Sequence, residues 1–229
     1  MPASITFQRD SAYEKLLAFI IEGRLLPDQS ISERKIATEL EIGRTPVREA
    51  MRALAQDGLL EIIPSRGTFV RSISDDQLRE LYEVRQALEG QAAELAARNG
   101  ATPELMDFAK KLVVSRQPET DEQVGETYEI GAQFHVAVFR CAGNAILTEL
   151  YLPIRNRFRG TMRLGRHYDR DWVVRGIDQH LNILDAISAK KPVKAKRLMR
   201  AHLLQSFDSK KKILEQLKRC ATTKTRLAS

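Results

Sequence analysis

The sequence predicts a mainly α-helical fold in two parts, a small N-terminal unit that ends in a β-hairpin and an all-helical bundle of about six helices. Two observations predict it. Apolar residues recur at i, i+3 and i+4 along most of the 229 residues, as on helices with one buried face. Residues 59–71 differ, because two short β-like runs flank Pro64-Ser65-Arg66-Gly67, a sequence typical of a hairpin turn. We expect domains at residues 1–72 and 73–220, then a flexible tail at 221–229.

Composition and cysteine usage limit what the chain can be. Hydrophobic residues make up 43% of it, enough for a packed core, and charged residues 29%, which argues against wholesale disorder. The longest apolar run, Leu16–Ile21, falls far short of the roughly 20 residues that a membrane helix needs. Cys141 and Cys220 match no metal-binding or redox spacing, and the N-terminus lacks a signal-peptide pattern. We therefore expect a reduced, cytoplasmic protein with no membrane partner.

Basic charge is concentrated at the C-terminal end. The net charge is +7, yet residues 1–70 hold nine basic and ten acidic residues. From Lys190 onward, 13 basic residues face only Asp208 and Glu215. Many lysines on a C-terminal helix indicate a solvated face more often than a surface that binds polyanions. Global charge therefore does not locate a nucleic-acid site.

Three helices and a hairpin are predicted in the N-terminal unit. The first helix covers residues 13–23, the second is capped by Ser32 and ends near residue 40, and the third covers residues 44–57 and is stopped by Gly58. Helix, helix, turn, helix and hairpin is the order of a winged helix-turn-helix, an architecture that places its recognition helix in the major groove of DNA.

The first turn of the third helix carries the candidate DNA contacts. Arg44 and Arg48 are four residues apart and share a face, opposite the apolar stripe that includes Val47 and Met51. Arginine is suited to bidentate contacts with guanine or phosphate. Arg66 lies in the hairpin, where it can reach a minor groove or a phosphate. Taken singly, such arginines usually only solvate a helix, but their register with a turn and a hairpin favours DNA binding.

The stretch SERKIATELEIGRTPVREAMRALAQDGLLEIIPSRGTFV resembles the DNA-binding domain of GntR-type bacterial transcription regulators, and the match covers about Tyr13–Val70. The resemblance implies that double-stranded operator DNA is contacted by Arg34, Arg44, Thr45 and Arg48, with Arg66 and Gly67 in the wing. The chain departs from the family in the turn, where Glu41-Ile42-Gly43 replaces Gly, a hydrophobic residue and Ser. Gly43 can still cap the third helix but has no hydroxyl to bind phosphate, so we expect an altered turn.

Beyond Ser74 the sequence predicts helices near residues 75–98, 103–115, 121–142, 145–166, 171–189 and 193–218. Their ends coincide with helix-breaking or capping residues, such as Asn99-Gly100 and Gly143-Asn144. Asn144 is expected to cap the helix that follows it.

Three histidines, His135, His180 and His202, occupy apolar periodic segments of three of these helices. A buried histidine is commonly a hydrogen-bonded core residue. Three neutral imidazoles from different helices can also converge on a divalent transition metal. Spacing alone leaves both alternatives open.

Residues 75–218 resemble the FCD effector domain of the FadR subfamily, through LYEVRQALEGQAAELAA, FHVAVFRCAGNAIL and the spacing of the last two histidines. The resemblance implies that His135, His180 and His202 bind a divalent transition metal such as zinc, nickel or manganese. The family's fourth ligand is an Asp four residues before the first histidine, and Gly131 stands there in this chain. Loss of an anionic ligand should weaken metal binding.

The same resemblance implies a small-molecule effector, commonly a small organic acid, bound within the helical domain. Arg85 matches an arginine that often faces the effector, and a buried guanidinium is suited to a carboxylate. The alternative for Arg85 is an ion pair with Glu89, one turn away, on the helix surface.

These features predict a ligand-responsive transcription regulator rather than an enzyme. We expect a homodimeric repressor that a small organic acid or related metabolite, such as a carboxylate, releases from a pseudo-palindromic operator. A homodimer is expected because one recognition helix reads only a few base pairs. The alternative is a metal-dependent hydrolase fused to a DNA-binding module, in which the three histidines activate water.

Overall fold

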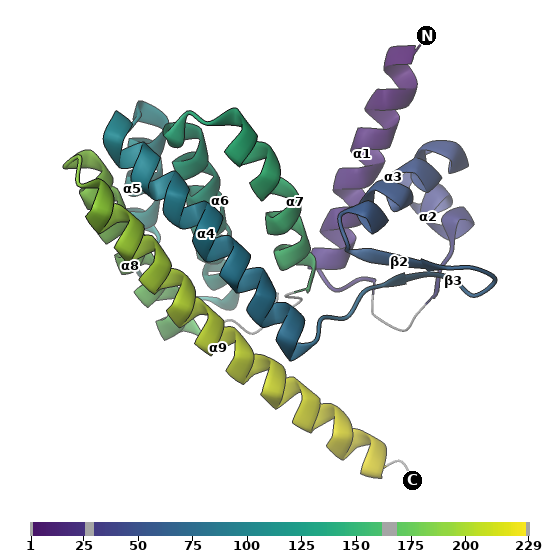
Figure 1. The fold of residues 1–229 in the computed structure, drawn as a ribbon. Helices are drawn as coiled ribbons and strands as arrows, with labels where there is room; N and C mark the ends of the chain where they lie inside the picture. Colours follow the sequence, from purple (N-terminus) through teal and green to yellow (C-terminus); the bar gives the residue numbers. More distant parts are fainter. Residues whose placement is uncertain (1, 26–29, 162–168, 228–229) are drawn as a thin grey trace. The chain divides into compact units, whose positions relative to one another are not determined.

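The computed structural model describes residues 2–25, 30–161 and 169–227, which form two compact units (Figure 1). One unit holds the chain up to Ser74 together with the second part of helix α7 (Ala145–Thr161), which begins at Leu152. The other holds Asp75–Tyr151 and the chain from Arg166. Within the described ranges, each helix is too short or too polar to cross a lipid bilayer.

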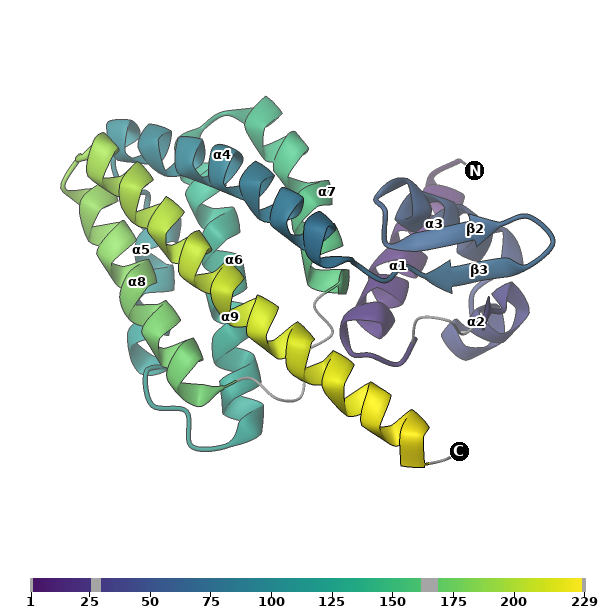
Figure 2. The ribbon, with the colours of Figure 1, turned by 60° about the horizontal axis from the view of Figure 1, so that its bottom comes forward.

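The first unit is built on three helices and a small sheet (Figure 2). The helices are α1 (Pro2–Ile21), α2 (Glu33–Leu40) and α3 (Arg44–Gln56), and the strands are β1 (Ser30–Ile31), β2 (Leu60–Ile63) and β3 (Gly67–Val70). The strands are antiparallel in the order β1-β3-β2, with Ser30 opposite Phe69 and Leu60 opposite Val70. The predicted helices and hairpin are therefore confirmed.

Two details of the first unit differ from the prediction. Helix α1 begins at Pro2 instead of near Tyr13. The residues before Tyr13 lack the regular apolar repeat that predicts a helix, so the sequence pattern did not reveal this part of α1. Strand β1 was not predicted, because two residues are too few to show a periodic pattern.

The packing of α1 on α3 decides which face of α3 is exposed. Leu16 of α1 and Val47 and Leu54 of α3 have no exposed surface, and all three belong to one hydrophobic core. Because the buried residues occupy one side of α3, the side chains of Arg44 and Arg48 are exposed on another side.

Helices α2 and α3 are both capped, although the turn between them departs from the sequence that is usual in the family. The Oγ of Ser32 accepts a hydrogen bond from the backbone N–H of Lys35 (3.4 Å), which caps α2 as predicted. Glu41 ends α2 in the left-handed conformation with φ 55°. Gly43 then caps α3 without a side-chain hydrogen bond, as expected for a residue with no hydroxyl.

The second unit is all-helical. Its helices are α4 (Asp75–Asn99), α5 (Pro103–Val114), α6 (Asp121–Ala142), α8 (Arg170–Ser188) and α9 (Pro192–Leu227), together with the first part of α7. The bounds agree with the predicted helices within about one residue, except at two ends. The last residues of the predicted helix 145–166 lie outside the described residues. Asn144 caps α7, accepting the N–H of Leu147 through Oδ1 (3.0 Å), as predicted.

Helix α9 also corrects the prediction. It was expected to end at residue 218 and to be followed by a tail at 221–229, but the helix continues to Leu227. After Pro192 the sequence contains no further Pro and no Gly, so no residue type that breaks a helix interrupts it.

The helices of the second unit pack around an interior that is partly polar. Helix α4 lies along α9, and α6 and α8 complete the centre of the bundle (Figures 1 and 2). Phe134, Phe139 and Tyr151 form part of an apolar core. Among the described residues of this unit, the buried polar side chains are Arg85, Glu89, Thr127, His135, His180, Ser206 and Lys210. Such a concentration of polar groups inside a bundle indicates a site.

Candidate functional site

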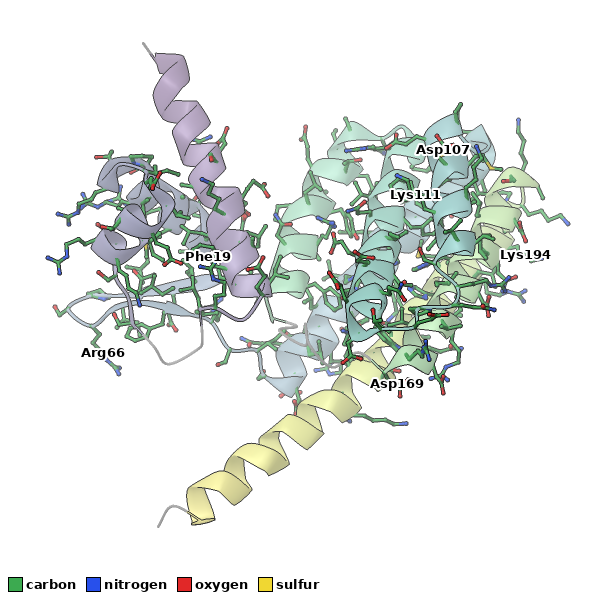
Figure 3. All side chains as sticks on the ribbon, turned by 180° about the vertical axis from the view of Figure 1, so that it is seen from behind. Phe19, Arg66, Asp107, Lys111, Asp169 and Lys194 are labelled. Atoms are coloured by element: carbon green, nitrogen blue, oxygen red, sulfur yellow. The ribbon has the colours of Figure 1, made fainter. Side chains whose placement is uncertain are left out.

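The residues that the sequence singled out for DNA contact are all on the surface of the first unit. Arg34 on α2, Arg44, Thr45 and Arg48 on α3, and Arg66 and Gly67 at the hairpin turn are exposed. The side chain of Arg44 is 64% exposed and that of Arg48 47%. Arg66 projects from the end of the hairpin (Figure 3). Gly67 has φ +117°, and a Cβ there would lie 2.6 Å from the Oγ of Ser30, so only glycine fits the turn.

Glu33 joins the two arginines of α3 to α2, a contact that sequence analysis missed. Its carboxylate accepts hydrogen bonds from Nε and Nη2 of Arg48 (3.0–3.2 Å) and lies 3.9 Å from Nη2 of Arg44. The hydrogen bond from Arg48 lowers the pKa of Glu33. Glu33 is far from both arginines in sequence, so no helical spacing could have revealed the pair.

The second unit brings the three predicted histidines together. His135 on α6, His180 on α8 and His202 on α9 offer ligand atoms that all lie within 4.8 Å of one another. The Nε2 atom of His180 is 3.1 Å from Nε2 of His135 and 3.2 Å from Nε2 of His202. Two nitrogens that share a tetrahedral zinc, at bond lengths of about 2.0–2.1 Å, lie about 3.3 Å apart. Both separations from His180 therefore fit nitrogens that share one metal ion.

Neighbouring acceptors orient two of these rings. Nδ1 of His135 lies 2.5 Å from Oε2 of Glu89, and Nδ1 of His202 lies 2.6 Å from Oε1 of Gln179. Because a carboxylate or an amide oxygen can only accept, these two contacts favour the tautomer that carries its hydrogen on Nδ1 and leaves the lone pair on Nε2. This is the arrangement in which histidines ligate metals.

Burial keeps two of the histidines, His180 and His202, in the form that binds metal. Desolvation, followed by the positive charges around them, lowers the pKa of His180 and of His202 well below the usual value of 6.5. Both imidazoles are therefore neutral at neutral pH, with lone pairs to donate.

Gly131 lies against the cluster, where the family places an Asp. A Cβ at this position would lie 3.0 Å from Cε1 and 3.4 Å from Nδ1 of His180. A larger residue would require the His180 ring to move by a few tenths of an ångström. Among the described residues, the candidate donor set therefore consists of three imidazoles.

Arg85 lies in the interior of the bundle, 5% exposed, and does not form a surface pair. Its Nε donates to Oε1 of Glu89 (2.6 Å), so both expected features, an inward position and a Glu89 partner, occur together. Burial would raise the pKa of Glu89, but the charge of Arg85 and the contacts of the carboxylate with Arg85 and His135 outweigh it and lower that pKa to about 2. Glu89 thus links the arginine to the histidine cluster as an ionised carboxylate.

A winged helix-turn-helix with exposed arginines, carried on the same chain as a helical unit with a polar, metal-compatible interior, defines a ligand-responsive DNA-binding regulator. Comparison with known proteins agrees. Residues 8–70 match the model of bacterial regulatory proteins of the gntR family, and residues 80–205 match that of the FCD domain. The chain therefore belongs to the gntR family of transcription regulators, in the group that carries an FCD domain, as expected for the FadR subfamily.

Individual relatives are moderately similar over nearly their full length. The Nta operon transcriptional regulator of Aminobacter aminovorans is 29% identical over 86% of this chain and 90% of its own. The transcriptional repressor RspR of Escherichia coli is 27% identical, with 89% of each chain covered. The structure of E. coli McbR/YncC shares the fold, with a TM-score of 0.77 at 23% identity over 90% of this chain and 98% of that chain. Because the family consists of regulators and not of enzymes, the hydrolase alternative is set aside.

Proposed function

We propose that the chain acts as a homodimeric repressor, whose two winged units bind the half-sites of a pseudo-palindromic operator. The proposed contacts are Arg34, Arg44, Thr45 and Arg48 in the helix-turn-helix and Arg66 and Gly67 in the wing. The observation that carries the proposal is the exposed first turn of α3, where Glu33 holds the guanidinium of Arg48 through two nitrogens. A guanidinium held in this way loses little rotamer freedom when it binds a base or a phosphate.

Replacement of Arg48 tests the proposed interface. We expect Arg48→Ala to weaken binding to the specific operator by about 1–3 kcal/mol without unfolding the protein, because the side chain is exposed. Operator DNA, first selected from genomic fragments by the wild-type protein, would be titrated in a fluorescence anisotropy assay at fixed salt.

Arg79→Ala is the matched control, because Arg79 is also exposed and also pairs with a glutamate, Glu83, but lies on α4. Equal operator affinity of wild type and Arg48→Ala would contradict the assignment of α3 as the recognition helix.

We also infer that His135, His180 and His202 hold a divalent transition metal. A set of three imidazoles favours zinc or nickel over manganese, which prefers oxygen ligands. The Nε2 separations and the orientation of the rings by Glu89 and Gln179 support this inference. A metal held here would supply a Lewis-acidic position for a carboxylate oxygen of the effector.

Metal binding is tested by removal of two ligands. We expect the wild-type protein, equilibrated with zinc and dialysed, to retain about one metal ion per chain, and the double variant His180→Ala, His202→Ala to retain none. Elemental analysis by mass spectrometry measures the ratio. Asp208→Ala, an exposed change on α9, should retain the metal. Wild-type protein that is metal-free after this treatment would reject the site.

The effector that we propose is a small carboxylate bound beside Arg85. Glu89 contacts both the guanidinium of Arg85 and the His135 ring, so Arg85 lies near the histidine cluster. We propose that one carboxylate of the effector contacts the arginine and the metal position together. Its binding would lower operator affinity only to the extent that it prefers the conformation that does not bind DNA, typically by about 1–3 kcal/mol.

A further inference from the structure

Lys210 is a lysine with no exposed surface, in the interior of the second unit. It lies on α9, two helical turns beyond His202. Its Nζ is 4.9 Å from the centre of the Tyr128 ring on α6 and 4.8 Å from the centre of the Trp172 ring on α8. The ammonium position is therefore framed by two aromatic rings from the two helices that also supply histidines.

The interior is arranged in layers that repeat along three helices. One turn separates successive members of each series, since residues three or four apart share a helix face. The series are Tyr128, Gly131 and His135 on α6, Trp172, Gly176 and His180 on α8, and Lys210, Ser206 and His202 on α9. The first members of the three series form the Lys210 layer, the second members the middle layer, and the third members the histidine layer. The rings of Tyr128 and Trp172 are 5.9 Å apart, and those of His135 and His180 are 4.9 Å apart, so both end layers are in contact across the bundle.

The middle layer is lined by small residues. Gly131 and Gly176 supply no side chain, and a Cβ at Gly176 would meet no atom within 4 Å. The hydroxyl of Ser206 is 2.8 Å from that of Tyr82, and the guanidinium of Arg85 lies 5.1 Å from the Tyr82 ring. Arg85 thus lies beside this layer, between the histidines at one end and Lys210 at the other.

The buried position of Lys210 is unusual for a side chain that is ordinarily charged. Burial of an amine is costly, and a methionine would fill the same space without that cost. Burial, followed by the charge of Arg85, lowers the pKa of Lys210 to about 7. A ligand anion placed between the two cations would favour the charged form of both.

We propose that Lys210 is a second effector contact and that the effector is a small dicarboxylate, with one carboxylate at Arg85 and the other at Lys210. This rests on the proposed binding of a carboxylate in this unit and adds to it a second anionic group. The spacing between the middle layer and the Lys210 layer is one helical turn, about 6 Å, which matches a diacid with a short carbon chain.

Paired ligands with equal numbers of carbon atoms test the inference on the full-length protein. Isothermal titration calorimetry would compare glutarate with pentanoate and adipate with hexanoate. We expect at least one dicarboxylate to bind the wild type about tenfold more tightly than its monocarboxylate partner. Lys210→Met should remove this preference and change the affinity for the monocarboxylate less than about twofold. Lys211→Met, an exposed neighbour, should keep the preference.

The outcomes separate this inference from the one on which it rests. If neither class of acid binds the wild type, the carboxylate effector itself is rejected. If both classes bind it equally, or if Lys210→Met weakens both equally, the carboxylate effector stands and the role of Lys210 is rejected. Lys210→Gln, checked for native helicity by circular dichroism, gives a second polar variant in which the same loss of preference is expected.

Discussion

Glu89→Ala is expected to lower the free energy of unfolding by about 3–5 kcal/mol. Glu89 has no exposed surface, and its carboxylate contacts both Arg85 and His135. Removal of the carboxylate leaves a buried guanidinium without its anionic partner and takes away the acceptor for Nδ1 of His135. An uncompensated buried charge costs much more than the loss of an exposed ion pair.

The same interaction predicts a pH dependence. The pKa of Glu89 is about 2 in the folded protein and 4.5 in an ordinary environment. A carboxyl group whose folded pKa is lowered contributes stability that is present above its unfolded pKa and is lost as the pH falls toward the folded value. The difference in stability between wild type and Glu89→Ala should therefore shrink by about 3 kcal/mol from pH 6 to pH 2.

A second pair on the same helix provides the control. Arg79 and Glu83 have the same i, i+4 spacing on α4, but both are exposed. Glu83→Ala should change the free energy of unfolding by less than about 0.5 kcal/mol, because solvent screens the pair. Urea unfolding followed by circular dichroism measures both variants. Equal effects of the two substitutions would show that burial does not strengthen the Arg85–Glu89 interaction as argued.

Local patterns were sufficient to predict the first unit. Ser32, Gly43 and Gly58 are capping or stop signals that act within a few residues, and the apolar stripe of α3 fixes which of its residues face outward. The Glu33–Arg48 pair could not be predicted in this way, because it depends on how α2 and α3 cross. Local chemistry therefore determines the elements, and tertiary packing determines the contacts between them.

The site in the second unit was predictable only in part. Three histidines in apolar segments indicated an inward site, and Arg85 was found through its family resemblance. Glu89 was considered only as a surface partner of Arg85, since its contact with His135 requires α4 to face α6. Lys210 was hidden for a different reason: it begins the run Lys210-Lys211-Lys212, and a run of lysines is typical of a solvated face.

Lys210→Met is expected to raise the free energy of unfolding at pH 7 by about 3–4 kcal/mol. The pKa of Lys210 falls from 10.5 to about 7 on folding, chiefly through burial. Each unit of pKa corresponds to about 1.4 kcal/mol, and contact with the Tyr128 and Trp172 rings offsets part of the cost. Methionine removes the ionisable group and retains most of the buried apolar surface.

The pH dependence distinguishes this cost from a general gain in packing. A lysine whose folded pKa is lowered destabilises the protein most at and below that pKa, and the penalty disappears as the pH rises toward 10.5. The advantage of Lys210→Met should therefore be largest near pH 7 and should decline toward pH 10, whereas Lys211→Met, on the exposed side of α9, should change little at either pH. A loss of stability in Lys210→Met would mean that the amine holds the bundle together. A gain would mean that the protein keeps this amine against its own stability, as expected for a group retained to bind a ligand.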